Sequence, residues 1–135
     1  MLIANYVYMT RSTLSPHVQI YKFPITATTS ILNRITGLAL SGMFLAGSAV
    51  PYIYDDIHPL YQSLSPKTKQ GLHGLLTFPI VYHTFGGIRH FLWDAYPHLL
   101  TNAKATKSSY VLIGSSIVTT GAMQWLFESN KESNS

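Results

Sequence analysis

The sequence of 135 residues contains no cysteine, and only 10% of its residues carry a charge. The absence of cysteine excludes disulfides, iron–sulfur ligation by this chain and thiol chemistry. The charged fraction is well below the roughly 25% of soluble domains. The net charge of +4 comes from nine scattered Lys and Arg residues that form no basic stripe, so it does not indicate nucleic-acid binding.

The few charges divide the chain into uncharged runs of similar length. These runs contain 20, 19 and 20 residues, at 35–54, 70–88 and 108–127. A helix of about 20 residues spans the ~30 Å hydrocarbon layer of a bilayer. A soluble helical bundle would need polar outer faces, and a β-barrel would need many alternating segments; neither pattern is present. The sequence therefore predicts an all-α membrane protein with three transmembrane helices, at about 30–54, 66–94 and 108–128.

These helices are expected to form one transmembrane domain, residues 30–129, between an N-terminal segment, 1–29, and a polar tail, 130–135. The Lys and Arg residues divide unequally between the two sides of the membrane. The side of the N-terminus and of the second loop carries six, namely Arg11, Lys22, Arg34, Arg89, Lys104 and Lys107. The opposite side carries three, namely Lys67, Lys69 and Lys131. The positive-inside rule then predicts that the N-terminus lies on the matrix or cytoplasmic side.

The first and third expected helices are rich in small residues. They include Gly37, Gly42 and Gly47 in the first helix and Gly114, Ser116 and Gly121 in the third. Small residues allow membrane helices to approach closely. We therefore expect close packing of both helices, with neighbours beyond these three.

The second expected helix carries a histidine, His83, inside its uncharged run. An ionisable residue within a bilayer indicates a functional site, although a neutral imidazole bonded to a neighbouring backbone or hydroxyl group is the simpler alternative. His90 follows two turns later on the same face, beside Arg89. A buried imidazole with cationic groups nearer the surface suits a haem, whose iron takes an axial nitrogen while its propionates lie near positive charge. Gly86 and Gly87 remove bulk where a macrocycle or another helix could approach.

The number of histidines limits how a haem could be held. His73 and His83 are about 15 Å apart along one helix, so they cannot bind the same iron. A haem with two imidazole ligands must therefore take its second histidine from another chain. No cluster of three or four ligands suggests zinc, and no nucleophile elbow suggests a hydrolase.

Three motifs together point to a known family. They are "LSPHVQIY" at 14–21, "SILNRITG" at 30–37 and "YHTFGGIRHFLWD" at 82–94. Their order and spacing resemble the cytochrome b large subunits of succinate dehydrogenase, respiratory complex II. The resemblance implies a three-helix membrane anchor that forms half of a heterodimeric haem-binding bundle. Its implied partners are a second small anchor subunit, an iron–sulfur subunit and a flavoprotein subunit, and its implied location is the mitochondrial or bacterial inner membrane.

The resemblance also implies roles for particular residues. Succinate is oxidised at the flavoprotein, so no succinate chemistry is expected on this chain, and electrons pass through iron–sulfur clusters to a quinone. His83 matches the axial ligand of haem b. Ser30 and Arg34 match residues of the pocket for ubiquinone or a related quinone. Arg34, Asn33 and His90 match the region of the haem propionates.

The chain departs from the family's usual motifs at Asn33, at Gly86–Gly87 and after Arg11, and two alternatives remain open. Asn33 stands where the family usually has histidine, and asparagine can donate a hydrogen bond to a propionate but carries no charge. The anchor of a quinol:fumarate reductase is an alternative, since the sequence does not determine the direction of electron flow. A purely structural anchor would keep the helices and lose the ligands, and the presence of His83, Ser30 and Arg34 argues against it.

Overall fold

The structure, a computed structural model, describes residues 22–133, with side chains up to residue 130. Within this range the chain forms α3 (Ile25–Ile53), α4 (His58–Ser63), α5 (Pro66–Ala95), the 3-10 turn η1 (Pro97–Leu99) and α6 (Asn102–Ser133). No strand occurs in the described range, so the expected all-α class is confirmed. Arg11 and the motif at 14–21 lie outside the described residues.

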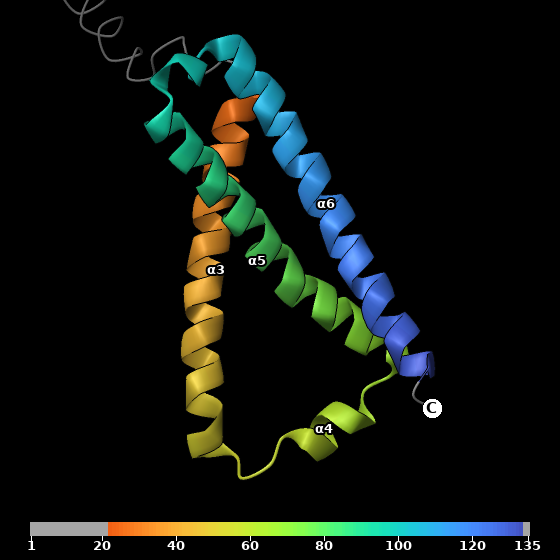
Figure 1. The fold of residues 1–135 in the computed structure, drawn as a ribbon. Coiled ribbons are helices and arrows are strands. Elements are labelled where there is room, and N and C mark those ends of the chain that lie inside the picture. The colour runs from red at the N-terminus through yellow and green to blue at the C-terminus, as the bar shows by residue number, and fades with distance from the viewer. Residues whose placement is uncertain (1–21, 134–135) are drawn as a thin grey trace, which may run out of the picture.

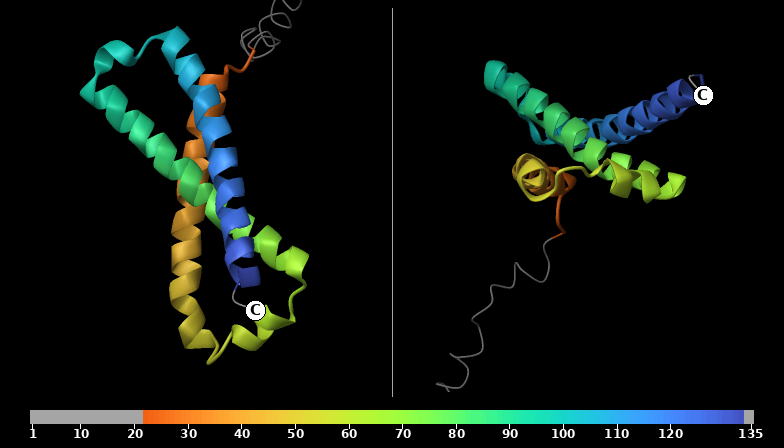
Figure 2. Two further views of the ribbon diagram at one scale, coloured as in Figure 1. Left: turned by 45° about the vertical axis from the view of Figure 1, so that its right-hand side comes forward. Right: turned by 90° about the horizontal axis from the view of Figure 1, so that it is seen from below.

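Three long helices run alternately up and down (Figure 1). The start of α3, the end of α5 and the start of α6 lie together at one end, which we call the junction end. The end of α3, the start of α5 and the end of α6 lie at the opposite end, together with α4, and we call this the α4 end. Both views in Figure 2 show that α3 crosses α5 and α6 near the junction end and diverges from them toward the α4 end.

The helix bounds differ from the uncharged runs for a physical reason. Helix α3 begins at Ile25, ahead of the expected start near residue 30, because the Pro24 carbonyl accepts the first backbone hydrogen bonds, from Ala27 and Thr28. Helix α6 begins at Asn102 and continues to Ser133, through most of the segment expected as a polar tail. An uncharged run measures the apolar layer, whereas a helix can continue beyond that layer into water.

Helix α5 covers nearly the expected range. Ser65 caps its first turn by accepting a hydrogen bond from the Thr68 N–H at 3.2 Å, and Pro66 occupies the first helical position, where its missing N–H costs nothing. Pro79 lies inside α5 without ending it. The helix therefore carries His83 and His90 on one continuous segment.

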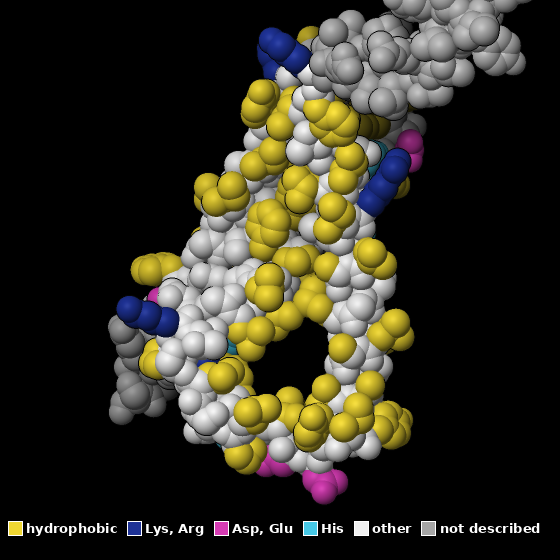
Figure 3. Space-filling model, turned by 180° about the vertical axis from the view of Figure 1, so that it is seen from behind, with side chains coloured by type: hydrophobic (Ala, Val, Ile, Leu, Met, Phe, Trp, Pro, Cys, Tyr) yellow, Lys and Arg dark blue, Asp and Glu magenta, His cyan; other side chains and the backbone are white. Residues whose placement is uncertain are grey.

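Burial in the described chain is the reverse of that in a soluble protein. The buried polar or charged side chains are Thr29, Thr36, Arg89, Ser109 and Ser116, while the buried apolar ones are only Val81, Tyr82 and Leu112. Large apolar side chains cover much of the outer surface (Figure 3). An apolar exterior around a polar interior fits a chain surrounded by lipid.

Three sets of residues form the inner faces, each repeating at helical spacing. They are Thr29, Asn33 and Thr36 on α3, Tyr82, Gly86 and Arg89 on α5, and Ser109, Leu112 and Ser116 on α6. Residues spaced three or four apart share one face of a helix. Each long helix thus presents a narrow face, largely of polar or small residues, to the other two.

Two of the described helices are long and apolar enough to cross a membrane, by length and composition. These are Ile25–Ile53 and the segment Asn102–Asn130 of α6. Helix α5 has 30 residues, but no membrane-length segment of it reaches the same hydropathy, because its uncharged run contains Gln70, His73, Pro79 and His83. The three-span arrangement is therefore not confirmed and stays a prediction.

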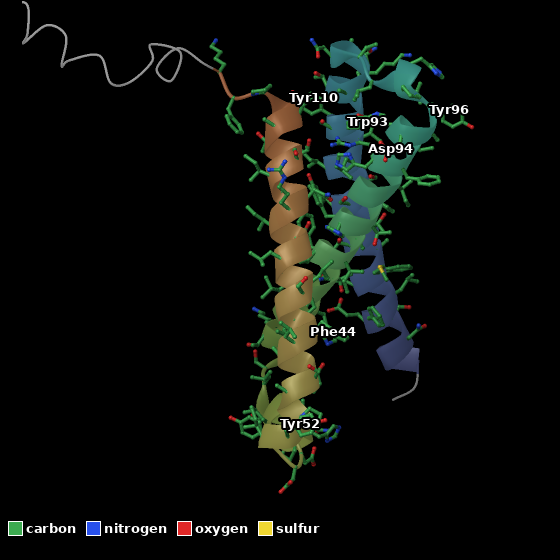
Figure 4. All side chains as sticks on the ribbon, turned by 90° about the vertical axis from the view of Figure 1, so that its left-hand side faces the viewer. Phe44, Tyr52, Trp93, Asp94, Tyr96 and Tyr110 are labelled. Atoms are coloured by element: carbon green, nitrogen blue, oxygen red, sulfur yellow. The ribbon has the colours of Figure 1, made fainter. Side chains whose placement is uncertain are left out.

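Aromatic side chains lie near both ends of the helices (Figure 4). Trp93, Tyr96 and Tyr110 lie at the junction end, and Tyr52 lies at the α4 end. Tyr52 is 92% exposed. Trp and Tyr are enriched where membrane proteins meet the two interfaces, so this distribution fits a bilayer between the two ends.

Candidate functional site

The imidazole of His83 lies against α3. Its Nδ1 is 3.0 Å from the backbone oxygen of Asn33, and because a carbonyl can only accept, Nδ1 carries the proton and donates. Nε2, the other ring nitrogen, makes no hydrogen bond within the described residues, and in the neutral tautomer that donates from Nδ1 it carries a free lone pair. Histidines that bind metals usually donate their other N–H to a carbonyl or carboxylate in this way.

The simpler alternative, an imidazole bonded to a neighbouring backbone group, accounts for only half of this arrangement. The Asn33 carbonyl satisfies Nδ1, and the half-buried ring still presents an Nε2 lone pair without a donor. A metal ion or a hydrogen-bond donor from outside the described chain is needed to bind this lone pair. The chemistry of His83 therefore fits an axial haem ligand.

Gly37 provides the surface on which the imidazole rests. A Cβ at this position would lie 2.7 Å from Cε1 of His83 and 3.2 Å from its Nδ1. Glycine is therefore required for the ring to approach α3 this closely. The sequence motif contains this glycine, but only the structure shows that it faces His83.

The Asn33 side chain closes the same crossing from the other side. It packs on Gly86 so tightly that a Cβ there would collide with its amide oxygen. That oxygen, Oδ1, is buried and has no hydrogen-bond partner in the described chain. The room provided by Gly86 is thus taken by another helix, while Gly87 meets nothing within 4 Å and stays open.

Ser30 and Arg34 lie one turn apart on α3. Ser30 is half-buried and Arg34 is exposed. The hydroxyls of Thr28, Thr29 and Thr36 all donate to backbone carbonyls three or four residues earlier, whereas that of Ser30 makes no hydrogen bond within residues 22–133. Its hydroxyl is therefore free to bond a ligand.

His90 and Arg89 are adjacent in sequence and differ in environment. The His90 ring is exposed and lies edge-on to Trp93, with ring centroids 5.4 Å apart. Arg89 is only 9% exposed, with its guanidinium carbon 4.4 Å from the centre of the same Trp93 ring. Among the described side chains, no contact connects His90 with His83 or with Asn33.

Arg89 instead belongs to a polar junction that ties all three helices together, formed by Thr29, Tyr82, Arg89 and Ser109. Nη1 of Arg89 donates to Oγ of Ser109 at 3.1 Å, and the Ser109 and Thr29 hydroxyls are 3.1 Å apart. The Tyr82 hydroxyl donates to the Thr29 backbone oxygen at 3.3 Å. From the sequence, Arg89 was expected near the membrane surface, as a topology charge and as a cation beside His90, and its burial was not predicted. The spacing of Tyr82, Gly86 and Arg89 along one face was the signal for its burial.

His73 is committed elsewhere, near the α4 end. Its Nε2 is 2.9 Å from the Tyr61 hydroxyl, and the two rings stack with their centroids 6.2 Å apart. His73 therefore has its Nε2 engaged by Tyr61, whereas the Nε2 of His83 is unbonded within the described residues. No group of three or more His, Cys, Asp or Glu residues in the described range could hold a metal ion by itself.

The fold and this site define a class of protein: the described chain is all-helical, with a polar interior, an apolar exterior and a half-buried histidine whose Nε2 is unbonded. Comparison with known proteins specifies the family. The model of the succinate dehydrogenase/fumarate reductase transmembrane subunits matches residues 9–123. The chain belongs to this family, which confirms the resemblance drawn from the three motifs.

Similar proteins occur in mitochondria and in bacteria. The chain is 39% identical to the human mitochondrial succinate dehydrogenase cytochrome b560 subunit over 87 residues, which are 60% of this chain and 52% of the relative. It is 36% identical to the corresponding Dictyostelium discoideum protein over 103 residues, 73% of this chain and 54% of the relative. It is 33% identical to the succinate dehydrogenase cytochrome b556 subunit of Paracoccus denitrificans over 122 residues, 78% of this chain and 83% of the relative. The chain spans about half the length of the first two of these curated relatives.

Proposed function

We propose that this chain is the cytochrome b anchor subunit of a succinate:quinone oxidoreductase in a mitochondrial or bacterial inner membrane. It crosses the membrane three times, with its N-terminus on the matrix or cytoplasmic side. It binds haem b through His83 and contributes Ser30 and Arg34 to a quinone pocket. The flavoprotein and iron–sulfur subunits, and a second anchor that supplies the other axial histidine, complete the complex.

The hydrogen bond from His83 Nδ1 to the Asn33 backbone oxygen is the observation that carries this proposal. It orients the ring and favours the tautomer in which Nε2 is unprotonated, which supports coordination through Nε2. A haem held by His83 would supply one-electron redox chemistry to this subunit. The name cytochrome b, carried by the mitochondrial and bacterial relatives, supports the same cofactor.

The arrangement at the junction end supports the quinone pocket. Ser30 and Arg34 lie near the start of α3, on the side where the positive-inside rule places the matrix or cytoplasm. A quinone carbonyl is an acceptor, which the unbonded Ser30 hydroxyl can satisfy and the Arg34 cation can polarise. Arg34 and His90 are both exposed near this end, where they can reach haem propionates.

The proposal is tested on the assembled complex with His83→Leu and Ser30→Ala. His83→Leu should remove the low-spin haem b signal from reduced-minus-oxidised spectra, because Leu cannot coordinate iron. His58→Leu, which changes an exposed histidine on α4, is the control and should keep that signal. Ser30→Ala should slow quinone reduction about tenfold while sparing succinate oxidation by a soluble dye, since one hydrogen-bond donor is lost. A normal haem spectrum in His83→Leu would refute the ligand assignment.

A further inference from the structure

The polar junction contains a buried cation that has no anionic partner among the described residues. Arg89 forms no ion pair with any residue of the described range, and its Nε is buried without a hydrogen-bond partner. The side chain is held by the Ser109 hydroxyl and by the Trp93 ring. A buried charge with few partners is costly, so the contacts that Arg89 does make should hold its position firmly.

Ser109 is the centre of the junction. Its Oγ contacts Arg89, the Thr29 hydroxyl and the backbone oxygen of Ala105, the last at 2.9 Å. The Thr29 hydroxyl also contacts the backbone oxygen of Thr26 at 3.0 Å. The Ser109 and Thr29 hydroxyls thus have two protons for three contacts: the one between them and one to each backbone oxygen. Arg89 can only donate, so Ser109 Oγ accepts from it. Removing the Ser109 oxygen would leave both Arg89 and Thr29 without their link to α6.

The junction lies next to the proposed ligand-binding residues in the chain. Thr29 directly precedes Ser30 on α3, and Tyr82 directly precedes His83 on α5. One turn further along α3, the Asn33 carbonyl accepts from His83. Two successive ties thus join α3 to α5, one through the junction and one through the imidazole itself.

We propose that Arg89 and Ser109 are positioning residues that set the separation and relative orientation of His83 and Ser30. They tie α6 to the crossing of α3 and α5 and so hold the crossing in register. This inference rests on the proposed function, in which His83 binds haem and Ser30 binds quinone. It assigns no contact with haem or quinone to Arg89 or Ser109 themselves.

The chain offers a matched pair of serines for the test. Ser109 and Ser116 lie two turns apart on α6, and both are 0% exposed. Ser116 donates only to the backbone oxygen of Leu112 in its own helix, at 2.7 Å. Ser109→Ala removes an interhelical tie, whereas Ser116→Ala removes an equally buried hydroxyl without breaking one.

Both variants are compared with the wild type in the assembled complex. Two properties are measured: the low-temperature EPR g-values of the oxidised haem, which report imidazole orientation, and the KM for a short-chain ubiquinone. Ser109→Ala should keep its haem content and dye-linked succinate oxidation, shift the g-values, and raise the quinone KM about threefold to tenfold. Ser116→Ala should match the wild type in both properties.

Arg89→Lys supplies a second test that does not depend on Ser109. It keeps the charge and one donor but loses the planar fork, so it should produce a shift of the same sign as Ser109→Ala. Wild-type g-values and quinone KM in both Ser109→Ala and Arg89→Lys, in a complex that contains haem, would overturn this proposal alone. Absence of haem from the wild-type complex would overturn the proposed function, and this inference with it.

Discussion

The two halves of α3 have similar lengths and contrasting surroundings. From Ile25 to Gly37 the helix packs on α5 and α6, and it contributes the buried Thr29 and Thr36. From Leu38 onward the helix has no buried residue, and most of its large apolar side chains are exposed, with Leu38 at 76% and Phe44 at 77%. In a bilayer, apolar surface does not drive helices together, so contact forms where polar and small residues meet.

Small residues alone do not produce that contact. Gly42 and Gly47, in the second half of α3, meet nothing within 4 Å, and the same holds for Gly114 and Gly121 on α6. The close packing expected at these glycines is not made within the described chain. The packed half differs because its glycine faces a specific polar partner, as Gly37 faces His83.

The largest effect that tests this contrast is expected at Phe44, near the middle of the first uncharged run. Phe44→Lys should raise the free energy of membrane insertion of α3 by about 2.5–3.5 kcal/mol, because a central lysine must enter hydrocarbon. Tyr52→Lys, at the exposed end of the same helix, should cost far less, since its ammonium can reach water. A translocon insertion assay on the isolated α3 segment measures both. Equal costs would mean that Phe44 does not lie at membrane depth.

The contrast between the two halves of α3 is tested by adding side-chain volume at one glycine in each half. Gly37→Val should destabilise the complex by about 1–3 kcal/mol, because the new side chain overlaps the His83 ring. Gly42→Val introduces the same side chain where nothing lies within 4 Å. Thermal unfolding followed by haem absorbance should separate the two variants. A Gly42→Val variant as unstable as Gly37→Val would show that the second half of α3 is packed in the assembled complex.

The smallest effect is expected from removing a single hydroxyl where α5 packs on α3. Tyr82→Phe removes the hydrogen bond to the Thr29 backbone oxygen from a side chain that is 1% exposed. It should cost about 0.5–1.5 kcal/mol of stability. Tyr110→Phe, at a tyrosine that is 63% exposed, should cost nothing measurable in the same denaturant titration. A Tyr82→Phe variant as stable as wild type would remove Tyr82 from the polar junction.

The sequence predicted the long helices because uncharged runs report the thickness of an apolar layer. It also singled out His83, since an imidazole within such a run needs a partner. It did not predict which carbonyl on α3 would be that partner, because Asn33 and His83 are 50 residues apart in the chain. It missed Arg89 as a buried residue because its charge suggested the membrane surface. Only the relative rotation of α5 and α6 places Ser109 within reach of it.

Because α3 crosses its neighbours near one end, a small tilt of this helix displaces its other end by a larger distance. Its contacts with α5 lie between Thr29 and Gly37, while the segment from Gly37 to Ile53 extends about 24 Å beyond them at 1.5 Å per residue. A tilt of about 10° around the crossing would move the far end of α3 by about 4 Å, yet would shift groups at the pivot much less. The second half of α3 can therefore tilt to match a bilayer of different thickness, or a differently placed neighbouring helix, while the His83 imidazole stays in contact with Gly37.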